Sequence, residues 1–460
     1  MRRSRTRGVV LSGFPTARGV PNLGPVPRKA MLRALTWCWR CSEDAEEMHH
    51  HEQGPPSPTT RPLLRLTWGR NSPADVKRQP AQLECGLCFR FAGGRYTLCS
   101  EIGHGAHCVV WRCLRVSKDG HPRAFALKVH TEEGAAFKRE SAALERLREV
   151  GRRGALFPHV LGKVRVGCRH GLAMALYGPD LYVLQKQRQR RPFPPPFVWA
   201  VAEQLALALE VLASAELVHA DIKPQNVVQH GGAGATLDRD SRIVLIDLGS
   251  CLSKEQLSSN VRRITYVQSR WYRSPEVLLW SSISFAADAW SVGCVLAEVA
   301  LGVPLLPGES EFNQVRRIDM LLGAPPMALL ERCRRAERFF VLPTLSAERS
   351  SACANVPLLR RGLASSEPAL IRYLPDADLG GLVHDYLCYQ SRHERDALVT
   401  ILEGLLRWDP NDRWASGRLH TEIRLLEPAG LRSSEVKSGS VPQHPWGFPA
   451  TAECCAAGSP

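Results

Sequence analysis

The stretch VHADIKPQNVV, residues 218–228, holds a carboxylate, an ammonium group and an amide at short, fixed spacings. Asp221 could accept a hydroxyl proton, Lys223 could neutralise a phosphoryl group, and Asn226 could hold a divalent metal ion through its amide oxygen. Further along the chain, the apolar run IVLI leads into Asp247, and a carboxylate at the end of a buried strand could bind a metal ion that bridges phosphates. These residue types in this order predict phosphoryl transfer.

A second group of candidate residues comes earlier, in IGHGAHCVV at residues 102–110. Gly103 and Gly105 lie where one predicted strand ends and the next begins, so the backbone there could approach a polyphosphate without an intervening side chain. A G-x-G sequence is also a common turn. In the pattern G-x-G-x-x-G-x-V the third glycine is here Cys108, whereas Val110 is kept. The loop is therefore a phosphate-binding candidate only in combination with other motifs.

The motif FALKV places Ala126 and Lys128 in the middle of a predicted strand. A buried ammonium group is costly without a partner of opposite charge. Glu140, on the helix predicted to follow, is a suitable partner, although only 12 residues separate it from Lys128. An ion pair between the two would hold the lysine beside the phosphates.

The segments that carry these residues fall into two parts of different character. Short β-rich runs separated by Gly, Asp and Pro predict an antiparallel sheet, namely RYTLCSEIGHG, CVVWRCLRV, AFALKVH, VLGKVRVG and GLAMALY. Residues 135–150 interrupt these runs with a predicted helix that has Leu144 and Leu147 on one face. From Phe197 onward the chain is predicted to be mostly helical, apart from IVLID at 243–247. A small β-rich lobe therefore precedes a larger helical one.

With these motifs in this order, the sequence resembles the eukaryotic protein kinases over about residues 96–430. The resemblance rests on the Gly-rich loop, the strand lysine, the helix glutamate, HAD-x-K-x-x-N, DLG, SPE at 274–276 and D-x-W-S-x-G at 288–293. It implies an α+β, bilobal protein kinase fold with a small antiparallel β-rich N-lobe and a larger helical C-lobe.

Within the kinases, the segments TYVQSRWYRSPEVLL and GCVLAEVALGVPLLPGESEFNQVRRI are similar to the CMGC group. Tyr266 followed by V-Q-S-R is most similar to the dual-specificity tyrosine-regulated and homeodomain-interacting kinases of that group. Ala220, where most kinases have Arg, agrees with this placement, since the homeodomain-interacting kinases are similar there.

The resemblance implies an ATP-dependent enzyme that transfers the γ-phosphate to Ser or Thr of protein substrates. Lys128 would hold the α- and β-phosphates and pair with Glu140. Asp221 would orient and deprotonate the substrate hydroxyl, and Lys223 would contact the γ-phosphate.

Cofactor sites are implied on both lobes. Mg²⁺ would be held by Asn226 and Asp247. By alignment through DLYVL, Met174 is expected near the back of the adenine pocket and Asp180 near the ribose edge. The full set of residues implied to bind ATP is Ile102, Gly103, Gly105, Val110, Ala126, Lys128, Met174, Leu176 and Asp180.

The resemblance also implies regulation through the activation loop. Tyr266 would be autophosphorylated, and Arg270 and Arg273 could pair with its phosphate. Arg273 also occupies the position that, in the related kinases, bonds a backbone carbonyl away from the substrate, so a proline-directed enzyme is expected. The alternatives are that Tyr266 is only a packed aromatic residue, and that Arg273 is a surface arginine or solely a partner of the phosphate on Tyr266.

A pseudokinase that acts as a binding or scaffold protein is the rival interpretation. Cys108 and the short interval between Lys128 and Glu140 favour it, whereas the complete polar set from Asp221 to Asp247 favours catalysis. In either case we expect protein partners, a monomer and no membrane partner.

The net charge of +15 is concentrated at one end of the chain. Residues 1–42 contain eight Arg, one Lys and no Asp or Glu, so this segment alone carries +9. Nucleic acid is therefore expected as a partner only through the basic N-terminal segment, for which a weak organelle-targeting signal is another interpretation. The expected location is otherwise intracellular, in the nucleus or the cytoplasm.

The chain is expected to divide into a basic, Pro-rich and poorly ordered extension at 1–90, a kinase domain at 96–430 and a tail at 431–460. Residues 324–400 are Arg-, Ser- and Ala-rich and are expected to be an insert in the helical lobe. The apolar segments 197–215 and 290–306 contain glutamates and are expected to be buried helices, not membrane spans.

Fifteen cysteines spread through apolar segments are typical of a reducing compartment. Cys38 with Cys41 and Cys85 with Cys88 have C-x-x-C spacing, and three histidines at 49–51 lie between the pairs. Zinc binding is therefore an alternative to free thiols.

Overall fold

A six-stranded antiparallel sheet forms the N-terminal part of the structure, with the strand order β1-β2-β3-β4-β6-β5. Its strands are β1 (Cys88–Phe91), β2 (Gly94–Gly105), β3 (Cys108–Arg115), β4 (Ala124–His130), β5 (Val160–Val166) and β6 (Arg169–Met174). The helix α2 (Ala135–Glu149) lies between β4 and β5 in the chain and contacts β6. The β-rich runs and the helix predicted for this part of the sequence are all present.

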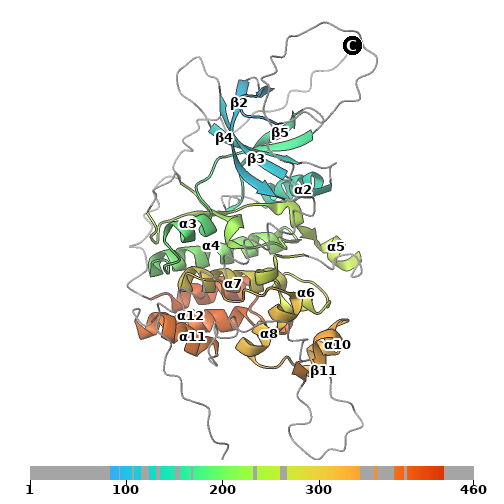
Figure 1. The fold of residues 1–460 in the computed structure, drawn as a ribbon, viewed down its shortest axis with the longest axis vertical. Coiled ribbons are helices and arrows are strands. Elements are labelled where there is room, and N and C mark those ends of the chain that lie inside the picture. The colour runs from blue at the N-terminus through green and yellow to red at the C-terminus, as the bar shows by residue number, and fades with distance from the viewer. Residues whose placement is uncertain are drawn as a thin grey trace, which may run out of the picture. The chain divides into compact units, whose positions relative to one another are not determined.

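The computed structural model describes residues 83–92, 94–105, 108–115, 124–130, 135–150, 156–166, 169–231, 236–259, 267–341, 357–359, 378–387 and 391–428. All of these residues belong to one compact unit. Figure 1 shows the sheet with α2 at one end of this unit and the helices of the second lobe at the other. The predicted order, a small β-rich lobe followed by a larger helical one, is confirmed.

The sheet is held together by large apolar side chains that gather on one side of it. In β2, buried Tyr96 and Leu98 alternate with more exposed neighbours, because successive strand residues face opposite sides of a sheet. The rings of Tyr96 and Phe125 meet edge to face with centroids 4.9 Å apart. β4 is central in the sheet and is buried along almost its whole length. This packing fixes the register that places Val110 opposite Lys128.

Strand β1 lies within the segment that the sequence analysis assigned to a poorly ordered extension, so that expectation is wrong for residues 83–90. In its sequence CFRF the half-buried Phe89 and Phe91 alternate with the exposed Cys88 and Arg90, which is the strand pattern that was overlooked. Phe89 and Phe91 pack near the sheet core, with ring centroids 6.3 and 5.9 Å from that of Phe125. Residues 1–82 lie outside the described part of the chain.

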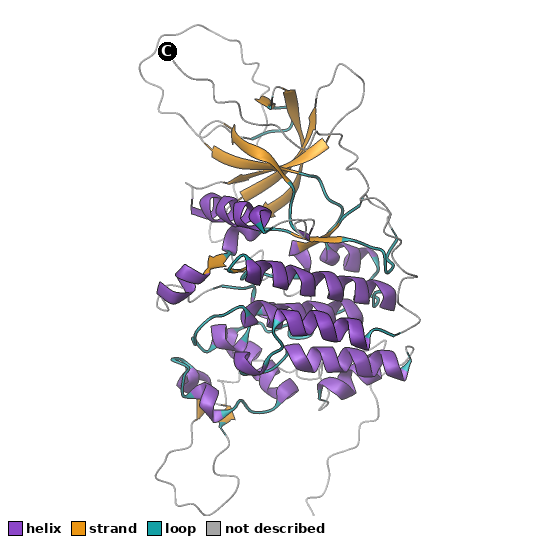
Figure 2. Cartoon of the chain, turned by 180° about the vertical axis from the view of Figure 1, so that it is seen from behind, coloured by secondary structure: helices purple, strands orange, loops and turns teal. Residues whose placement is uncertain are grey.

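The second lobe is mainly helical, as the purple segments of Figure 2 show. Its α-helices are α3 (Leu181–Gln187), α4 (Pro195–Ser214), α5 (Lys254–Ser259), α6 (Pro275–Leu278), α7 (Ala286–Leu301), α8 (Glu311–Leu322), α9 (Met327–Leu330), α10 (Ala336–Phe339), α11 (Leu379–Tyr386), α12 (Arg392–Leu405) and α13 (Ser416–Leu426). Single 3-10 turns are η2 (Pro224–Asn226), η3 (Leu248–Ser250), η4 (Arg270–Tyr272) and η6 (Pro410–Asp412).

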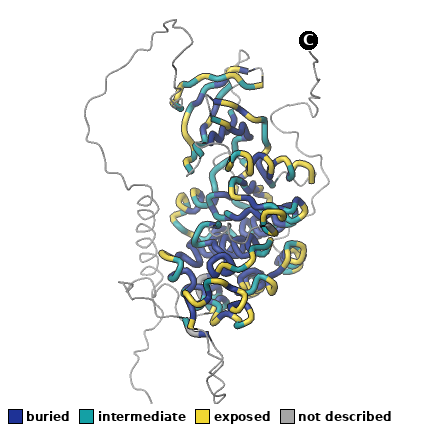
Figure 3. The backbone as a smooth tube through the Cα atoms, turned by 90° about the vertical axis from the view of Figure 1, so that its right-hand side faces the viewer, coloured by how far each residue is buried: buried dark blue, intermediate teal, exposed yellow. Residues whose placement is uncertain are grey.

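Helix α7 is the core of this lobe. Every residue from Ala287 to Leu301 is buried, and both α4 and α12 pack against the helix. Figure 3 shows the buried backbone concentrated in the interior of the helical lobe. The helix ends at Gly302, whose φ of 82° suits a residue without a Cβ atom.

Helix α4 is the one described helix that is long and apolar enough, by length and composition alone, to cross a membrane. However, 67% of its most apolar window is buried inside the protein. Gln204 in this helix also bonds Ser241 O and the backbone N–H of Ile243, at 2.9 Å each. Such contacts are those of a core helix that supports the neighbouring strand.

The expected insert at 324–400 contains more regular structure than its composition indicated. Helices α9, α10 and α11 lie within it, and α12 starts inside it and carries buried Ile401 and Leu402 against α7. The start of α12 is a capping box in which Ser391 and Glu394 bond each other's backbone N–H groups. The S-x-x-E sequence was the signal for this helix. Residues 342–356 and 360–377 lie outside the described part.

Four short strands fix the loops that carry the candidate catalytic residues. β7 (Leu217–Val218) pairs with β10 (Leu252–Ser253), and β8 (Val227–Gln229) pairs with β9 (Ile243–Leu245). A further pair, β11 (Phe340–Val341) with β12 (Leu358–Leu359), lies elsewhere in the helical lobe. The first two pairs enclose residues 219–226 on one side and residues 246–251 on the other. The chain segments of Asp221 and Asp247 are therefore brought together by strand pairing.

The zinc alternative finds no support in the part of the chain that the structure describes. Cys85 and Cys88 are exposed free thiols, and no cluster of three or more His, Cys, Asp or Glu among the described residues is arranged to hold a metal ion. Cys38 and Cys41 lie outside the described residues.

Candidate active site

Lys128 is a buried cation at the centre of a charge cluster that joins the two lobes. Its Nζ lies 2.9 Å from Glu140 Oε1 and 2.6 Å from Asp247 Oδ1. Burial alone would lower the pKa of Lys128, but the two carboxylates outweigh it and raise that pKa. The interval of 12 residues is sufficient for the ion pair, since β4 ends at His130 and α2 begins at Ala135.

Asp247 is ionised in this setting. Burial would raise the pKa of its carboxyl, but the charge and hydrogen bond of Lys128 lower it to about 2. Its backbone is left-handed, with a φ of 65°, and its side chain remains 41% exposed. A charged carboxylate with an accessible surface suits a divalent metal ion.

The Gly-rich segment forms the hairpin between β2 and β3. Gly103 pairs with Val110 and Gly105 pairs with Cys108, so three of the sequence-predicted residues lie together at this turn. A Cβ atom on Gly105 would lie 3.2 Å from Cys108 Sγ, so the cysteine occupies the space beside this glycine. Ile102 is 48% exposed at the same turn. Residues 106 and 107 lie outside the described chain.

The residues expected around the adenine base and the ribose follow one continuous path. Ala126 pairs with Met174 across β4 and β6, and both are buried. Leu176 follows in the connection to α3, and Asp180 caps that helix by accepting a hydrogen bond of 2.8 Å from Val183 N. Burial raises the pKa of Asp180.

Val228 is a residue of this path that the sequence analysis missed. Asp180 forms an isolated bridge with Val228, and the backbones of Gly178 and Gln229 are bonded at 2.9 Å. Buried Val228 therefore lies beside the ribose-edge residue. Its position two residues after Asn226, in the apolar pair Val227-Val228, was the available signal.

Lys223 and Asn226 both lie within hydrogen-bond distance of Asp221. Lys223 Nζ lies 3.0 Å from Asp221 Oδ2, and Asn226 Nδ2 donates to Asp221 O at 2.8 Å. Ser269, which the sequence analysis quoted but did not assign, donates from both its backbone N and its Oγ to Asp221 Oδ1, at 3.0 and 2.8 Å. Lys223 Nζ also donates to Ser269 Oγ at 3.1 Å. The activation segment therefore orients the candidate base.

Asp288 of α7, another residue that sequence analysis did not assign, bonds the backbone of the catalytic loop, residues 219–226. The backbone N–H groups of His219 and Ala220 donate to its carboxylate at 2.6 and 2.9 Å. Ala220 has a φ of 62°, so these bonds stabilise a backbone conformation that residues with a Cβ rarely adopt. His219 Nε2 lies 3.1 Å from Ile246 O, which links the loop to the residue before Asp247.

Asn226 and Asp247 are chemically suited to a magnesium ion. Asn226 makes its bonds to Asp221 through Nδ2, so its amide oxygen is the end left for a metal. One carboxylate and one amide oxygen make a small donor set, which Mg²⁺ accepts when phosphate oxygens and water complete its shell. The two residues therefore fit a metal that arrives with a nucleotide.

Arg270 and Arg273 have different surroundings. Arg273 is buried and donates from Nε to Val267 O at 3.0 Å and from Nη2 to Gln268 O at 2.8 Å. The alternative that it is a surface arginine is therefore wrong. Arg270 donates from Nη1 to Glu309 O at 2.7 Å. Tyr266 lies outside the described residues, so its predicted contact with these arginines stays a prediction.

Comparisons with known proteins agree with this geometry. Residues 96–422 match the protein kinase domain family. The serine/threonine-protein kinase ppk15 of Schizosaccharomyces pombe is 29% identical over 343 residues, which are 70% of this chain and 60% of the relative. Dual specificity tyrosine-phosphorylation-regulated kinase 3 of Rattus norvegicus is 31% identical over 363 residues, which are 75% of this chain and 57% of the relative.

A third relative extends the comparison to a second branch of the same group. Homeodomain-interacting protein kinase 1 of Caenorhabditis elegans is 31% identical over 257 residues, which are 55% of this chain and 29% of the relative. The chain thus spans about 60% or less of the length of these three curated relatives. The resemblance to the CMGC kinases and the bilobal α+β fold class are confirmed.

Proposed function

Because this chain belongs to the protein kinase family, we propose that it transfers the γ-phosphate of ATP to Ser or Thr residues of protein substrates. The observation that carries the proposal is the cluster in which Lys128 contacts both Glu140 and Asp247. A strand lysine, a helix glutamate and a metal-binding carboxylate must all be in place for phosphoryl transfer by kinases. Incubation of the purified protein with labelled ATP, Mg²⁺ and a peptide library is the direct test.

The residues of the site divide the work of phosphoryl transfer among them. Lys128 holds phosphate oxygens, and Glu140 keeps its ammonium group directed at them. Asp221 accepts the proton of the substrate hydroxyl, while Lys223 offsets charge on the transferred group. Magnesium held by Asn226 and Asp247 would neutralise the phosphates. Most of the rate enhancement then comes from positioning and charge.

A pseudokinase is the competing proposal, and Cys108 is the observation that favours it. The thiol occupies the place of a glycine in the hairpin, and burial raises its pKa despite the nearby charge of Lys128. The neutral thiol of Cys108 takes up room in the hairpin where a phosphate would bind. It would therefore weaken nucleotide binding while every catalytic group stays in place. Nucleotide binding without measurable transfer by the wild-type protein would favour the pseudokinase.

We propose further that the enzyme prefers Pro after the acceptor residue, because of the backbone at Gln268. This residue has a φ of 64°, and its carbonyl oxygen accepts bonds from Arg273 Nε at 3.1 Å and Nη2 at 2.8 Å. Its side chain donates to Ala287 O at 3.0 Å and accepts from Ser274 N at 2.9 Å. A carbonyl held inside the protein cannot pair with a substrate N–H. Only Pro lacks that N–H, so it alone leaves no donor unpaired.

Peptides with Pro after the acceptor are expected to be phosphorylated about tenfold faster than peptides with Ala there, since an unpaired N–H costs roughly 1–3 kcal/mol. In Arg273→Ala, the ratio of the two rates should fall towards one. The ratio is the proper measurement, because it does not depend on how much of the variant is folded. Arg270→Ala is the matched control and should keep the ratio. Equal rates for Pro and Ala in the wild-type protein would contradict the proposal.

Autophosphorylation of Tyr266 is a separate proposal that rests on its neighbours. The backbone of Val267 is fixed by Arg273, and among the described residues Arg270 Nε is buried without a hydrogen-bond partner. A phosphate on Tyr266 would add about −1.5 to −2 charges and acceptor oxygens close to two arginines in sequence.

Protein expressed in bacteria is therefore expected to carry phosphate on Tyr266, as read by mass spectrometry. The Asp221→Asn protein, expressed in the same way, should lack it, which separates autophosphorylation from modification by a host enzyme. Fully active wild-type enzyme with unmodified Tyr266 would rule out activation by autophosphorylation of this tyrosine.

A further inference from the structure

His130, the last residue of β4, lies beside the carboxylate oxygen of Glu140 that Lys128 does not contact. His130 Nε2 is 3.3 Å from Glu140 Oε2, whereas Lys128 Nζ is 2.9 Å from Oε1 of the same carboxylate. The side chains of His130 and Glu140 are 3% and 1% exposed. One buried carboxylate therefore has a lysine on one oxygen and an imidazole on the other.

Among the described residues, the ring nitrogens of His130 and Glu140 Oε2 have no polar partner other than each other. Within the described residues, no hydrogen bond ends on either ring nitrogen of His130 or on Glu140 Oε2. Buried polar atoms of native proteins are nearly always paired, because water cannot replace a missing partner there. The 3.3 Å contact between the two residues lacks hydrogen-bond geometry in the structure, yet it is the nearest polar pairing that the described residues offer to either side chain atom.

The imidazole ring packs against α2 through Phe137, which is itself backed by β6. Phe137 of α2 meets it edge to face, with ring centroids 5.5 Å apart. Phe137 in turn stacks on His170 of β6, with centroids 5.1 Å apart and an interplanar angle of 27°. The ring of His130 is therefore fixed relative to the helix that carries Glu140.

Glu140 needs a second contact because Lys128 is shared. Lys128 Nζ is closer to Asp247, at 2.6 Å, than to Glu140. When Asp247 and Lys128 both turn to a bound nucleotide, the ammonium group alone cannot keep the helix carboxylate in place. A donor on Oε2 that does not take part in nucleotide binding can.

We propose that His130 is a positioning residue, which donates from Nε2–H to Glu140 Oε2 and so holds the carboxylate that directs Lys128. Imidazole can present this N–H in its neutral form as well as when protonated, so the contact does not require a charge on the ring. This inference rests on the proposed kinase function, because it assigns a role in positioning Lys128 for catalysis.

A pair of substitutions of similar size separates hydrogen bonding from packing. His130→Gln places an amide N–H near the position of Nε2, whereas His130→Met fills the space without a donor. Both remove the ring from Phe137. His130→Met is expected to lower kcat about tenfold, the size of a lost hydrogen bond to a charged group. His130→Gln should restore most of that loss, with the KM for the peptide unchanged in both variants.

A double-mutant cycle with Glu140→Gln tests whether His130 acts through Glu140. In the Glu140→Gln protein, His130→Met should cause little additional loss of kcat. An undiminished tenfold loss in that background, or equal activity of the Met and Gln variants, would overturn the proposal.

Hydrogen exchange of the amides in α2 gives a readout that does not need activity. Exchange in Ala135–Glu149 should be faster in His130→Met than in His130→Gln, with the strands β2 and β3 unchanged in both. Equal exchange in the two variants would also overturn the proposal. A wild-type protein without phosphate transfer would instead contradict the proposed function, and the exchange comparison would remain decisive for His130.

Discussion

Replacing Asp221 by Asn is expected to lower kcat by about 10³-fold and to leave the protein folded, as removal of a positioned general base typically costs 10²–10⁴ in rate. An amide cannot accept the hydroxyl proton. Its oxygen can still accept the two bonds of 3.0 and 2.8 Å from Ser269, so the loop keeps its main contact with the activation segment. The lower kcat should therefore come from the missing proton acceptor and not from a displaced loop.

The measurement is the steady-state rate with labelled ATP at saturating peptide, together with a melting curve. Asp412→Asn is the matched control, because it makes the same chemical change at an exposed position outside the site. Its rate should equal that of the wild-type protein. If the Asp221→Asn protein kept a tenth or more of the wild-type rate, another group would have to be the base.

Lys128→Met is expected to reduce the rate by at least 10²-fold for a different reason, the loss of a charge aimed at the phosphates. The substitution also leaves Glu140 and Asp247 facing each other across the space of the lost ammonium group. The pKa of Asp247, which Lys128 holds at about 2, would then rise. The steady-state rate with labelled ATP measures the loss, and magnesium binding that is lost at a higher pH on acidification than in the wild-type protein would report the change in this pKa.

Most of the site could be predicted because its residues belong to short motifs with fixed internal spacing. Asp221, Lys223 and Asn226 lie on one loop, and β8 follows that loop at once, so their convergence is a local property of the chain. The ion pair of Lys128 with Glu140 needed only a strand, a short connection and a helix. In each case the sequence separation was small and the element types were clear.

The residues that were missed act across long sequence separations. Asp288 supports the catalytic loop from a helix 68 residues away from Ala220, and Ser269 reaches Asp221 across 48 residues. His130 has no motif of its own, and its contact with Glu140 depends on how α2 packs against the sheet. No period or spacing in the sequence contains that information, because tertiary packing decides it.

Strand β1 and helix α12 were missed for a more local reason. CFRF is only four residues long and follows a Pro-rich region, so its composition was averaged with that of its neighbours. The capping box at Ser391 and Glu394 lies next to residues whose charge hid the apolar face of α12. Attention to caps and two-residue alternation would have recovered both elements.

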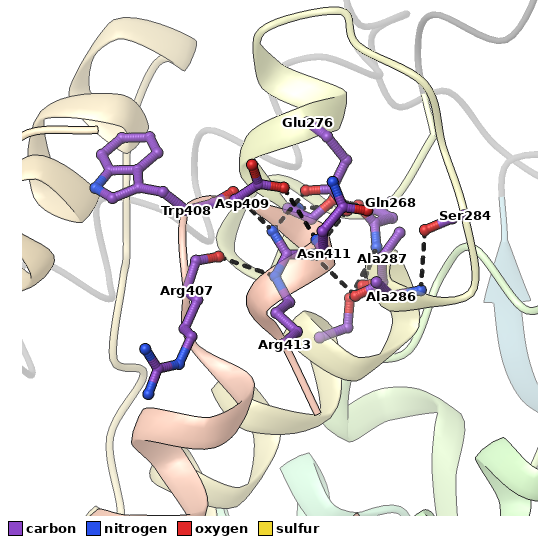
Figure 4. A network of polar contacts seen from close by, with 12 residues as sticks. Gln268, Glu276, Ser284, Ala286, Ala287, Arg407, Trp408, Asp409, Asn411 and Arg413 are labelled. Carbon is purple, nitrogen blue, oxygen red and sulfur yellow. Dashed lines mark hydrogen bonds and ion pairs between the residues drawn. The ribbon is translucent and has the colours of Figure 1, made fainter. Parts of the chain in front are cut away.

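The largest stability effect is expected at a buried ion pair between Glu276 and Arg413. Arg413 Nη1 and Nη2 lie 2.7 and 2.6 Å from the two carboxylate oxygens of Glu276, and both side chains are 0% exposed. Figure 4 shows Arg413 bonded in addition to backbone oxygens, with distances of 2.9 Å to Arg407 O and 2.9 Å to Ala286 O. The pair joins helix α6, which follows the activation segment, to the start of α7 and to the chain before α13.

Either Glu276→Gln or Arg413→Met is expected to reduce the free energy of unfolding by about 3–5 kcal/mol. The first leaves the buried guanidinium of Arg413 without a counter-charge, and the second leaves the buried carboxylate of Glu276 without one. Urea unfolding followed by intrinsic tryptophan fluorescence measures the loss. The double variant should lose much less than the sum of the two single losses, since the second substitution removes the group that the first left unpaired.

The ion pair of Arg332 with Asp409, whose arginine is about half exposed, is a control for the effect of burial on such pairs. Arg332 Nη2 lies 2.6 Å from Asp409 Oδ2, the same distance as in the buried pair, but the side chain of Arg332 is 47% exposed and that of Asp409 is 12% exposed. Arg332→Ala is expected to cost at most about 1 kcal/mol, because water replaces the lost contact. If Arg332→Ala and Arg413→Met destabilised the protein equally, distance alone would determine the strength of these pairs. A much larger effect of Arg413→Met would instead show that burial determines it, since removing one partner of a desolvated pair leaves the other with nothing to bond.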